Sequence, residues 1–318
     1  MNNRTIIATL LAMSACSQAQ ATAINNIDQI TFADVNFKQC VEVHRVTDPS
    51  KTKKLNCRHL PMQSLDDLKY FPALENVTLA GPEISNIDLS HNPQLKNLSI
   101  NSKQLNSIDL SHTPNLEVLS IDAKQIASID LSRTPKIKEL AVMSAQLQSI
   151  DLSHTPELEE LNVSFNQLTA IDLSANPKLT DLSVVGNQLT KLDLSHNPAL
   201  RYLWAKENQF STIDFSANNA LVQVGLDSNQ ITELSLPKNN QISSLGLMYN
   251  QLTSLDVSHS PKLSKLYITD NHISSLDVSN NPKLRKLWAT GNPIAAVDIS
   301  NNEKLNDYEF NDNTKVSE

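Results

Sequence analysis

Carboxylates recur along this chain at a fixed spacing. From Asp88 to Asp298 the same position carries Asp every 21 residues, with Ser235 as the one replacement. Carboxylates arranged in this way could bind Ca²⁺, as in some other repeat proteins. Such sites use spaced Gly-Asp turns, however, and this chain contains only 5 glycines. We therefore expect each Asp to accept hydrogen bonds from backbone or Ser groups, stacked about 4.8 Å from its neighbours.

Histidines form a second series, at His91, His112, His154, His196 and His259. Only the first two lie in adjacent repeats, so a metal site there would lack ligands, and we interpret the series as surface turn residues. The sequence contains no nucleophile elbow, glycine-rich phosphate loop or Cys-x-x-Cys pair. Because catalysis needs several different groups that converge on one point, the sequence predicts no catalytic residue, no metal site, no cofactor and no enzymatic activity.

The scarce aromatic residues form a third group. Trp204, Tyr267 and Trp288 share one 21-residue register, and Gly225 and Gly246 occupy the same register between them. Trp and Tyr dominate binding hot spots, and a glycine floor would let a partner approach the backbone closely. The alternative is that these rings only pack on one another and shield the sheet. The predicted ligand-binding residues are Phe165, Tyr202, Trp204, Lys206, Asp227, Met248, Tyr249, Lys265, Tyr267, Lys286 and Trp288.

A 21-residue unit must position all of these side chains. In one copy, Leu161-Asn162-Val163 alternates inward and outward positions, which predicts a short strand. Leu168 and its equivalents fill the rest of the core. The return path is too short and too rich in β-branched residues and proline for a helix. Stacked units should therefore pair their strands into one parallel sheet on the concave side, with extended or 3₁₀ segments on the convex side.

The unit resembles the leucine-rich-repeat consensus L-x-x-L-x-L-x-x-N-x-L over residues 55–310. The resemblance implies a mostly β solenoid with little helix outside an N-terminal cap. The Asn of the motif, present from Asn166 to Asn292, should bond free backbone groups of adjacent coils. The first four repeats depart from the pattern with Pro82, Lys103, Lys124 and Ala145, which indicates a looser turn or a separate local surface.

Both ends of the repeat array are expected to carry caps, because open coils would expose apolar faces and sheet edges. Residues 32–60 resemble the N-terminal cap of bacterial internalin-like repeat proteins. At the other end Tyr308 and Phe310 take inward strand positions, before a polar tail. We divide the chain into a signal peptide (1–23), an N-terminal cap with the first coil (24–73), eleven tandem 21-residue repeats (74–305), and a C-terminal cap and tail (306–318).

The first 23 residues have the features of an export signal, with Arg4 before a short apolar run. Met13-Ser14-Ala15-Cys16 resembles a bacterial lipobox, which would make Cys16 a lipidated N-terminus. The alternative is ordinary cleavage after Ala21 or Ala23. We therefore expect an extracytoplasmic protein, either an outer-membrane or cell-surface lipoprotein or a secreted or periplasmic one.

Removal or lipidation of the first cysteine leaves Cys40 and Cys57, an even pair in an oxidising compartment. A disulfide between them would close a loop of about 17 residues and stabilise the fold by about 3 kcal/mol. The alternative is two reduced, buried thiols.

The formal net charge of −8 argues against a nucleic-acid partner, because phosphate binding needs a basic face. No later apolar run could act as a membrane helix, so membrane contact would come only through a lipid anchor. We expect a monomer that binds a protein on its concave face, as in adhesion or envelope interactions. The alternative is a carbohydrate-binding surface protein that uses the same aromatic groove.

Overall fold

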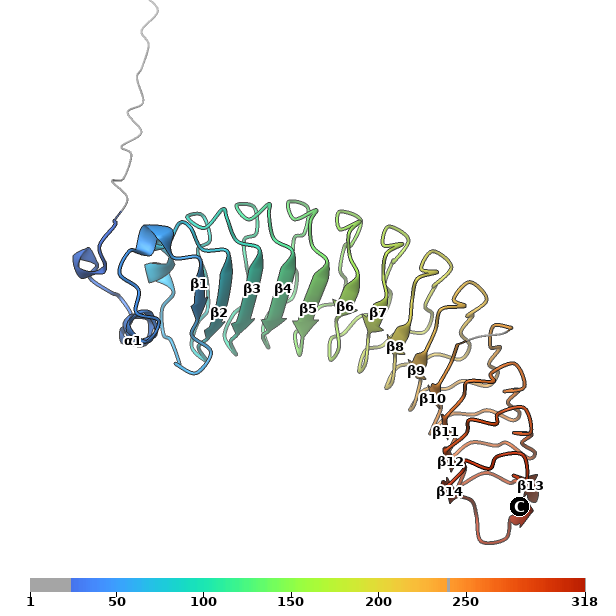
Figure 1. The fold of residues 1–318 in the computed structure, drawn as a ribbon. Helices are drawn as coiled ribbons and strands as arrows, with labels where there is room; N and C mark the ends of the chain where they lie inside the picture. The colour runs from blue at the N-terminus through green and yellow to red at the C-terminus, as the bar shows by residue number, and fades with distance from the viewer. Residues whose placement is uncertain (1–23, 239–240, 318) are drawn as a thin grey trace, which may run out of the picture.

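The computed structural model of the chain describes residues 24–238 and 241–317. The expected signal peptide, with Cys16, lies outside this part. The described chain forms an arched solenoid in which each 21-residue repeat makes one coil (Figure 1). One 13-stranded parallel sheet, in the order β1 to β12 and then β14, lines the concave side (Figure 1). The expected fold class, a mostly β solenoid with a parallel concave sheet, is confirmed.

The elements follow the repeat order. The N-terminal part contains η1 (Ile27–Gln29), α1 (Val35–Val43), η2 (Pro49–Lys51), β1 (Lys54–Asn56) and η3 (Asp66–Tyr70). The next four strands have five residues each: β2 (Asn76–Ala80), β3 (Asn97–Asn101), β4 (Val118–Asp122) and β5 (Glu139–Met143). Three-residue strands follow: β6 (Glu160–Asn162), β7 (Asp181–Ser183), β8 (Tyr202–Trp204), β9 (Gln223–Gly225), β10 (Ser244–Gly246), β11 (Lys265–Tyr267), β12 (Lys286–Trp288), β13 (Ala296–Asp298), β14 (Asp307–Glu309) and β15 (Lys315–Ser317).

The core is a continuous aliphatic stack. Along β3 the burial alternates, with Leu98 and Ile100 inward, and each strand pairs with the next in a 21-residue register, as in Leu245 opposite Leu266. On the convex side the described repeats contain extended chain and single turns, such as the bond from Asn92 N to Leu89 O, while the 3₁₀ helices lie before β2. Burial of one aliphatic layer per coil is the main stabilising term of this fold.

The inward asparagines tie each coil to the one before it. Asn208 Nδ2 donates to Val184 O at 2.9 Å and to Lys206 O at 3.0 Å, and Asn208 Oδ1 accepts from Leu189 N at 3.1 Å. This arrangement confirms the predicted role of the motif Asn, because one buried amide satisfies backbone groups of two coils. The same bonds recur at Asn166, Asn187, Asn229, Asn250, Asn271 and Asn292.

The first four repeats replace the asparagine turn with longer strands. β2 to β5 each continue for two residues beyond the three of later strands, so the inter-strand bonds extend where the Asn would otherwise turn the chain. In this part Ser102 is buried, and its Oγ donates to Ile84 O at 2.6 Å. Figure 1 shows that the stack runs nearly straight from β2 to β5 and bends from β6 onward. The bend therefore begins where the asparagines begin.

A second buried polar series lies on the opposite side of the coil, at the position before the convex proline. Asn176 Nδ2 donates to Leu152 O at 3.3 Å and to Thr155 O at 2.8 Å, both in the preceding coil. Where this position is Thr, its hydroxyl bonds within its own coil, as from Thr113 Oγ1 to Leu110 O at 3.0 Å. This series was not predicted from the sequence.

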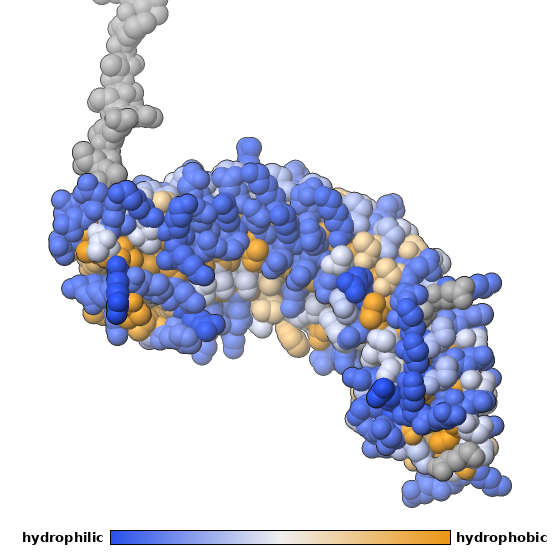
Figure 2. Space-filling view, in the orientation of Figure 1, coloured by the Kyte–Doolittle hydropathy of each residue, from blue (hydrophilic) through white to orange (hydrophobic). Residues whose placement is uncertain are grey.

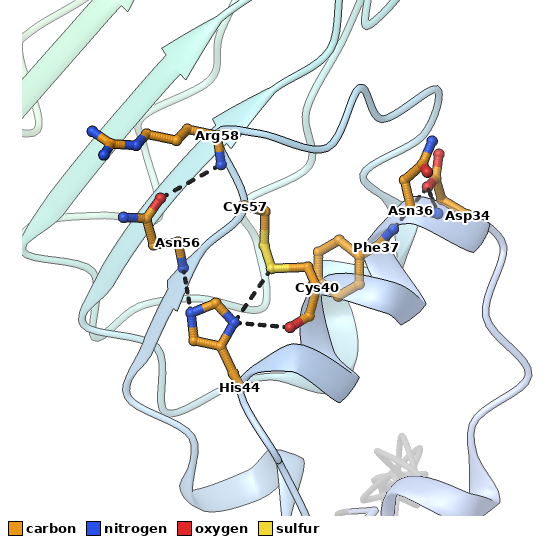
Figure 3. The surroundings of a disulfide bond; sticks show 8 residues. All are labelled: Asp34, Asn36, Phe37, Cys40, His44, Asn56, Cys57 and Arg58. Atoms are coloured by element: carbon orange, nitrogen blue, oxygen red, sulfur yellow. Dashed lines mark hydrogen bonds between the residues drawn. A yellow bond between two sulfur atoms is a disulfide. The ribbon is translucent and has the colours of Figure 1, made fainter.

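A disulfide joins Cys40 of α1 to Cys57 directly after β1, with a Cα–Cα distance of 5.5 Å (Figure 3). The prediction of a disulfide is confirmed, and the alternative of two reduced thiols is wrong. His44 Nδ1 lies 2.8 Å from Cys40 O, and Asn56 N donates to His44 Nε2 at 3.4 Å. α1 therefore lies fixed over the open end of the core, where Phe37 is fully buried.

One carboxylate also anchors α1 at its N-terminus. Asp34 accepts from Asn36 N and Phe37 N at 2.7 and 2.8 Å through Oδ1, and from Gln63 N and Ser64 N at 2.6 and 3.0 Å through Oδ2. Burial alone would raise the pKa of Asp34, but these four donations outweigh it and lower the pKa. The helix start and a loop 29 residues away in sequence are held by one side chain.

The C-terminal segment differs from the expected polar tail. Tyr308 takes the inward register opposite Leu287, as predicted, yet 38% of its surface is exposed because it belongs to the last coil of the described stack. Beyond it, β15 pairs with β13 in a separate two-stranded sheet. Part of the expected tail therefore adds a strand to the fold.

Replacing Asn208 by Ala should lower the free energy of unfolding by about 2–3 kcal/mol, because Leu189 N and the buried carbonyls lose their partner. The matched control is Asn219→Ala, an exposed asparagine on the convex side of the same coil, which should change the value by less than about 0.5 kcal/mol. Urea unfolding followed by circular dichroism measures both. Equal losses in the two variants would contradict the assigned role.

Replacing both Cys40 and Cys57 by Ser should lower the free energy of unfolding by about 3 kcal/mol, because the denatured chain loses its cross-link. A reductant should destabilise the native chain by a similar amount and leave the double variant unchanged in the same urea experiment. A native chain that is indifferent to the reductant would show that the disulfide contributes nothing to stability.

Candidate binding surface on the concave face

A hollow of about 280 Å³ lies on the outer surface of the sheet over β8 to β12, and we call it the aromatic hollow. It gathers seven of the predicted ligand-binding residues. These are Trp204, Lys206, Asp227, Met248, Lys265, Tyr267 and Trp288. Most of the visible molecular surface is hydrophilic, with apolar patches in places along the arch (Figure 2).

Two rings of the aromatic hollow hold each other in place. Tyr267 and Trp288 lie on adjacent paired strands, with ring centroids 4.9 Å apart in an edge-to-face arrangement. Trp288 Nε1 donates to Asp307 Oδ1 at 3.0 Å, and Lys286 pairs with the same carboxylate and lies 5.8 Å from the Trp288 ring. These contacts fix the orientation of Trp288.

The expected bare glycine floor is wrong. Gly225 and Gly246 are buried under the chain's own side chains. A Cβ on Gly225 would lie 2.8 Å from the ring of Trp204, and a Cβ on Gly246 would lie 2.9 Å from the carboxylate of Asp227. The glycines therefore leave room for the Trp204 ring to lie over β9 and for Asp227 to lie over β10, rather than for a partner to reach the backbone.

Asp227 and Lys206 form an ion pair that makes up part of the base of the aromatic hollow. Lys206 Nζ lies 2.6 Å from Asp227 Oδ2, and Met248 N donates to Asp227 Oδ1 at 2.9 Å. The carboxylate is largely buried, whereas the lysine remains half-exposed. A buried carboxylate that is paired on both oxygens serves here to position Lys206 rather than to act as a free charge.

The other four predicted residues lie outside the hollow's lining. Lys286 is committed to Asp307, and Tyr202 is half-buried with the Arg201 guanidinium 5.4 Å from its ring centroid. Phe165 and Tyr249 occupy the position directly before the inward Asn and are more than half exposed. Both have a left-handed backbone with φ of 57°, which costs bulky residues about 1–2 kcal/mol. The same left-handed conformation recurs at this position in Ser144, Glu207, Ser228 and Asp270, so it belongs to the turn of the repeat and does not single out these two residues.

A second hollow, of about 330 Å³, lies over β4 to β8, and we call it the acidic hollow. Small side chains such as Ser120, Ala141 and Ser183 form its base, and Trp204 lines both hollows. Its charged residues are Glu139, Glu160 and Asp181. This hollow was not predicted from the sequence, although its acids recur at the same 21-residue spacing.

Charged residues at two adjacent repeat positions form two columns along this sheet. One column contains pairs of opposite charge, and the other contains three adjacent acids. In the first, Glu75 pairs with Lys53 and Lys96 at 2.8 and 2.9 Å, and these two lysines lower the pKa of Glu75 to about 2. In the second, Glu139, Glu160 and Asp181 lie side by side on paired strands. Burial, followed by the charges of these two neighbours, raises the pKa of Glu160. The acidic hollow therefore gathers neighbouring carboxylates, whereas Glu75 in the first column is paired with lysines.

The aspartate series on the convex side behaves as expected. Asp88 Oδ1 accepts from Ser90 N at 2.9 Å, and the Ser90 hydroxyl and amide lower the pKa of Asp88. The same turn recurs at Asp109, Asp130, Asp151, Asp172, Asp193, Asp214, Asp256, Asp277 and Asp298. The hydrogen-bonding interpretation of this series is confirmed.

The histidine series lies on exposed turns, as predicted, and Ser90 Oγ lies 2.9 Å from His91 Nδ1. Within residues 24–238 and 241–317, no three His, Cys, Asp or Glu side chains are placed to share a metal ion. The same residues include no helix long and apolar enough to cross a bilayer.

Comparisons with known proteins identify the fold. No protein-family model and no curated protein matches this sequence. The functional domain of InlJ from Listeria monocytogenes is 21% identical, with a TM-score of 0.59 over 88% of this chain and 79% of that one. The internalin inlF from the same organism is 20% identical, with a TM-score of 0.65 over 92% of this chain and 99% of that one.

A chain of the Toll–Spatzle complex from Drosophila is 16% identical, with a TM-score of 0.65 over 85% of this chain and 42% of that one, so this protein spans less than half of that chain's length. At these identities the likeness concerns the fold. The protein is a leucine-rich-repeat solenoid, similar in fold to the bacterial internalins.

Replacing Gly225 by Ala should displace the Trp204 ring, because the new Cβ would lie 2.8 Å from it. We expect red-shifted tryptophan emission, stronger acrylamide quenching, and a stability loss of about 1–3 kcal/mol. The control is Gly246→Ala, whose Cβ meets Asp227 instead and should leave the emission unchanged. Identical emission for the native chain and both variants would contradict the packing of Trp204 over β9.

Proposed function

We propose that this protein is an extracytoplasmic binding module that captures a protein partner on its concave face. The observation that carries the proposal is the aromatic hollow, in which Trp204, Tyr267 and Trp288 line one surface. Both tryptophans of the chain lie there, on outward strand positions that the core does not need. Exposed aromatic groups gathered on one face of a protein usually mark an interaction site.

The solenoid supports this role because its stability and its outer surface are separable. Aliphatic layers stabilise every coil, and the inward Asn side chains add their bonds from Asn166 onward. The outward strand residues lie outside this core. Such positions can change their side chains without loss of the fold. Among the similar structures, two belong to a complex between two proteins, Toll and Spatzle.

The proposed location is outside the cytoplasm. The Cys40–Cys57 disulfide supports it, because such bonds persist in oxidising compartments. The apolar run near Arg4 and the lipobox-like segment at Cys16 support export and a lipid anchor, with secretion or a periplasmic location as the alternative. We propose a monomer without a nucleic-acid partner, in keeping with the net charge of −8.

Carbohydrate binding is the second candidate, because aromatic rings stack on sugar faces and three such rings line the aromatic hollow. The edge-to-face contact of Tyr267 with Trp288 weighs against a flat platform at that end, which favours a protein partner. A glycan array compared with a pull-down from intact cell envelopes separates the two candidates. Saturable binding to one glycan class without a captured protein would select the carbohydrate alternative.

Replacing Trp204 and Trp288 together by Ala should abolish capture of the partner in the pull-down, because both rings bury large areas at an interface. The thermal melting temperature should change by less than about 4 °C, since both side chains point outward. The control replaces Val35 and Val43, two exposed apolar residues of α1, by Ala and should leave capture intact. Unchanged capture by the tryptophan variant would contradict the proposal, as would loss of folding.

A further inference from the structure

We propose that the acidic hollow binds a lysine- or arginine-bearing segment of the partner protein, with its cationic side chains seated between the carboxylates and Trp204. This inference rests on the proposed function and names the chemistry of the partner. The recognition elements are Glu139, Glu160, Asp181 and Trp204, which line one hollow over β4 to β8.

The three carboxylates lie on consecutive strands in register, Glu139 opposite Glu160 and Glu160 opposite Asp181. Adjacent strands lie about 4.8 Å apart, so like charges at this spacing repel one another. In the described chain no Lys, Arg or His lies within ion-pair distance of any of the three, and the lining of the hollow contains no basic residue.

The neighbouring column shows that the fold can neutralise such a stack. There Glu75 and Lys96 pair at 2.9 Å, and Glu117 and Lys138 pair at 3.0 Å, with opposite charges on adjacent strands. Alternating acidic and basic residues could neutralise the second column in the same way, because its strands pair in the same register. A chain that keeps three like charges together despite their repulsion departs from local optimisation, and such departures concentrate at functional sites. A cationic ligand removes the repulsion.

The electrostatic environment of Glu160 agrees with this argument. Its side chain is exposed, and desolvation together with the charges of Glu139 and Asp181 raises its pKa. An ammonium or guanidinium group placed beside it would supply a counter-charge and reduce the repulsion. One such contact at an exposed site is worth little, so the proposal depends on three carboxylates that act together.

The shape of the hollow fits a polypeptide side chain. Ser120, Ala141 and Ser183 are small and leave space above the sheet, and the hollow measures about 330 Å³. Trp204 forms the boundary toward β9 and is 37% exposed. A ring in this position attracts lysine and arginine through its π face while their aliphatic stems bury apolar area. The carboxylates and the ring together therefore select a cation with an apolar stem.

Fluorescein-labelled hexa-arginine, titrated with the full chain and followed by fluorescence anisotropy, tests the proposal. The triple variant Glu139→Gln, Glu160→Gln, Asp181→Asn should bind it at least about tenfold more weakly than the native chain. The matched control changes Glu83, Glu233 and Glu303 to Gln, which removes the same charge from exposed sites elsewhere, and its affinity should stay within about twofold. Equal weakening in both triple variants, or none in either, would overturn the proposal.

A second readout locates the bound peptide. In the Trp288→Phe background all tryptophan emission comes from Trp204, and hexa-arginine should change that emission in this chain but not after the three acidic substitutions. Unchanged Trp204 emission on saturation would place the peptide elsewhere and overturn the proposal. Thermal melts establish that each variant is folded. If the acidic triple variant does not fold, Glu160→Gln alone takes its place.

Failure of this inference is separable from failure of the proposed function. If the acidic triple variant keeps both its hexa-arginine affinity and its envelope partner, while Trp204→Ala with Trp288→Ala loses that partner, the charge proposal is wrong and the binding role stands. If the tryptophan variant keeps the partner and the acidic variant still loses hexa-arginine, the acidic site is real and the aromatic assignment is wrong.

Discussion

The bonds of one buried amide hold this fold in register. Each inward Asn donates to backbone carbonyls of its own and the preceding coil and accepts an amide N–H, so it links successive coils without help from outward side chains. An unpaired polar group at that depth would cost about 1–3 kcal/mol. Where the Asn is missing, longer strands supply the bonds instead and the stack runs straighter. The bend of the arch coincides with the coils that carry this Asn.

Because the buried residues of each coil stabilise the fold, the outward strand residues are free to form a recognition surface. The concave face has two hollows that share Trp204, one lined by aromatic rings and one by like-charged carboxylates. Both contain features that the core does not need, aromatic rings in the first and three carboxylates side by side on paired strands in the second. We propose that a partner relieves the repulsion of these carboxylates, which the adjacent column avoids by pairing its glutamates with lysines.

The period, the parallel sheet and the Asn bonds could be predicted from the sequence, because each depends on a local pattern that repeats every 21 residues. The disulfide could be predicted because only Cys40 and Cys57 remain after the export signal. The aromatic register correctly placed Trp204, Tyr267 and Trp288 in one hollow. The bare glycine floor was wrong, because register alone does not say which way the Trp204 ring lies, and it covers Gly225. The acidic hollow was missed because its shape depends on side chains from five strands together.

The central claim is that a partner binds on the concave side of the arch. Hydroxyl-radical footprinting of the chain, alone and with its envelope partner bound, tests this claim without any mutation. We predict that Trp204, Tyr267 and Trp288 become protected, while the exposed convex residues His112 and His196 keep their reactivity. Protection of the convex histidines with unchanged oxidation of the concave rings would contradict the account.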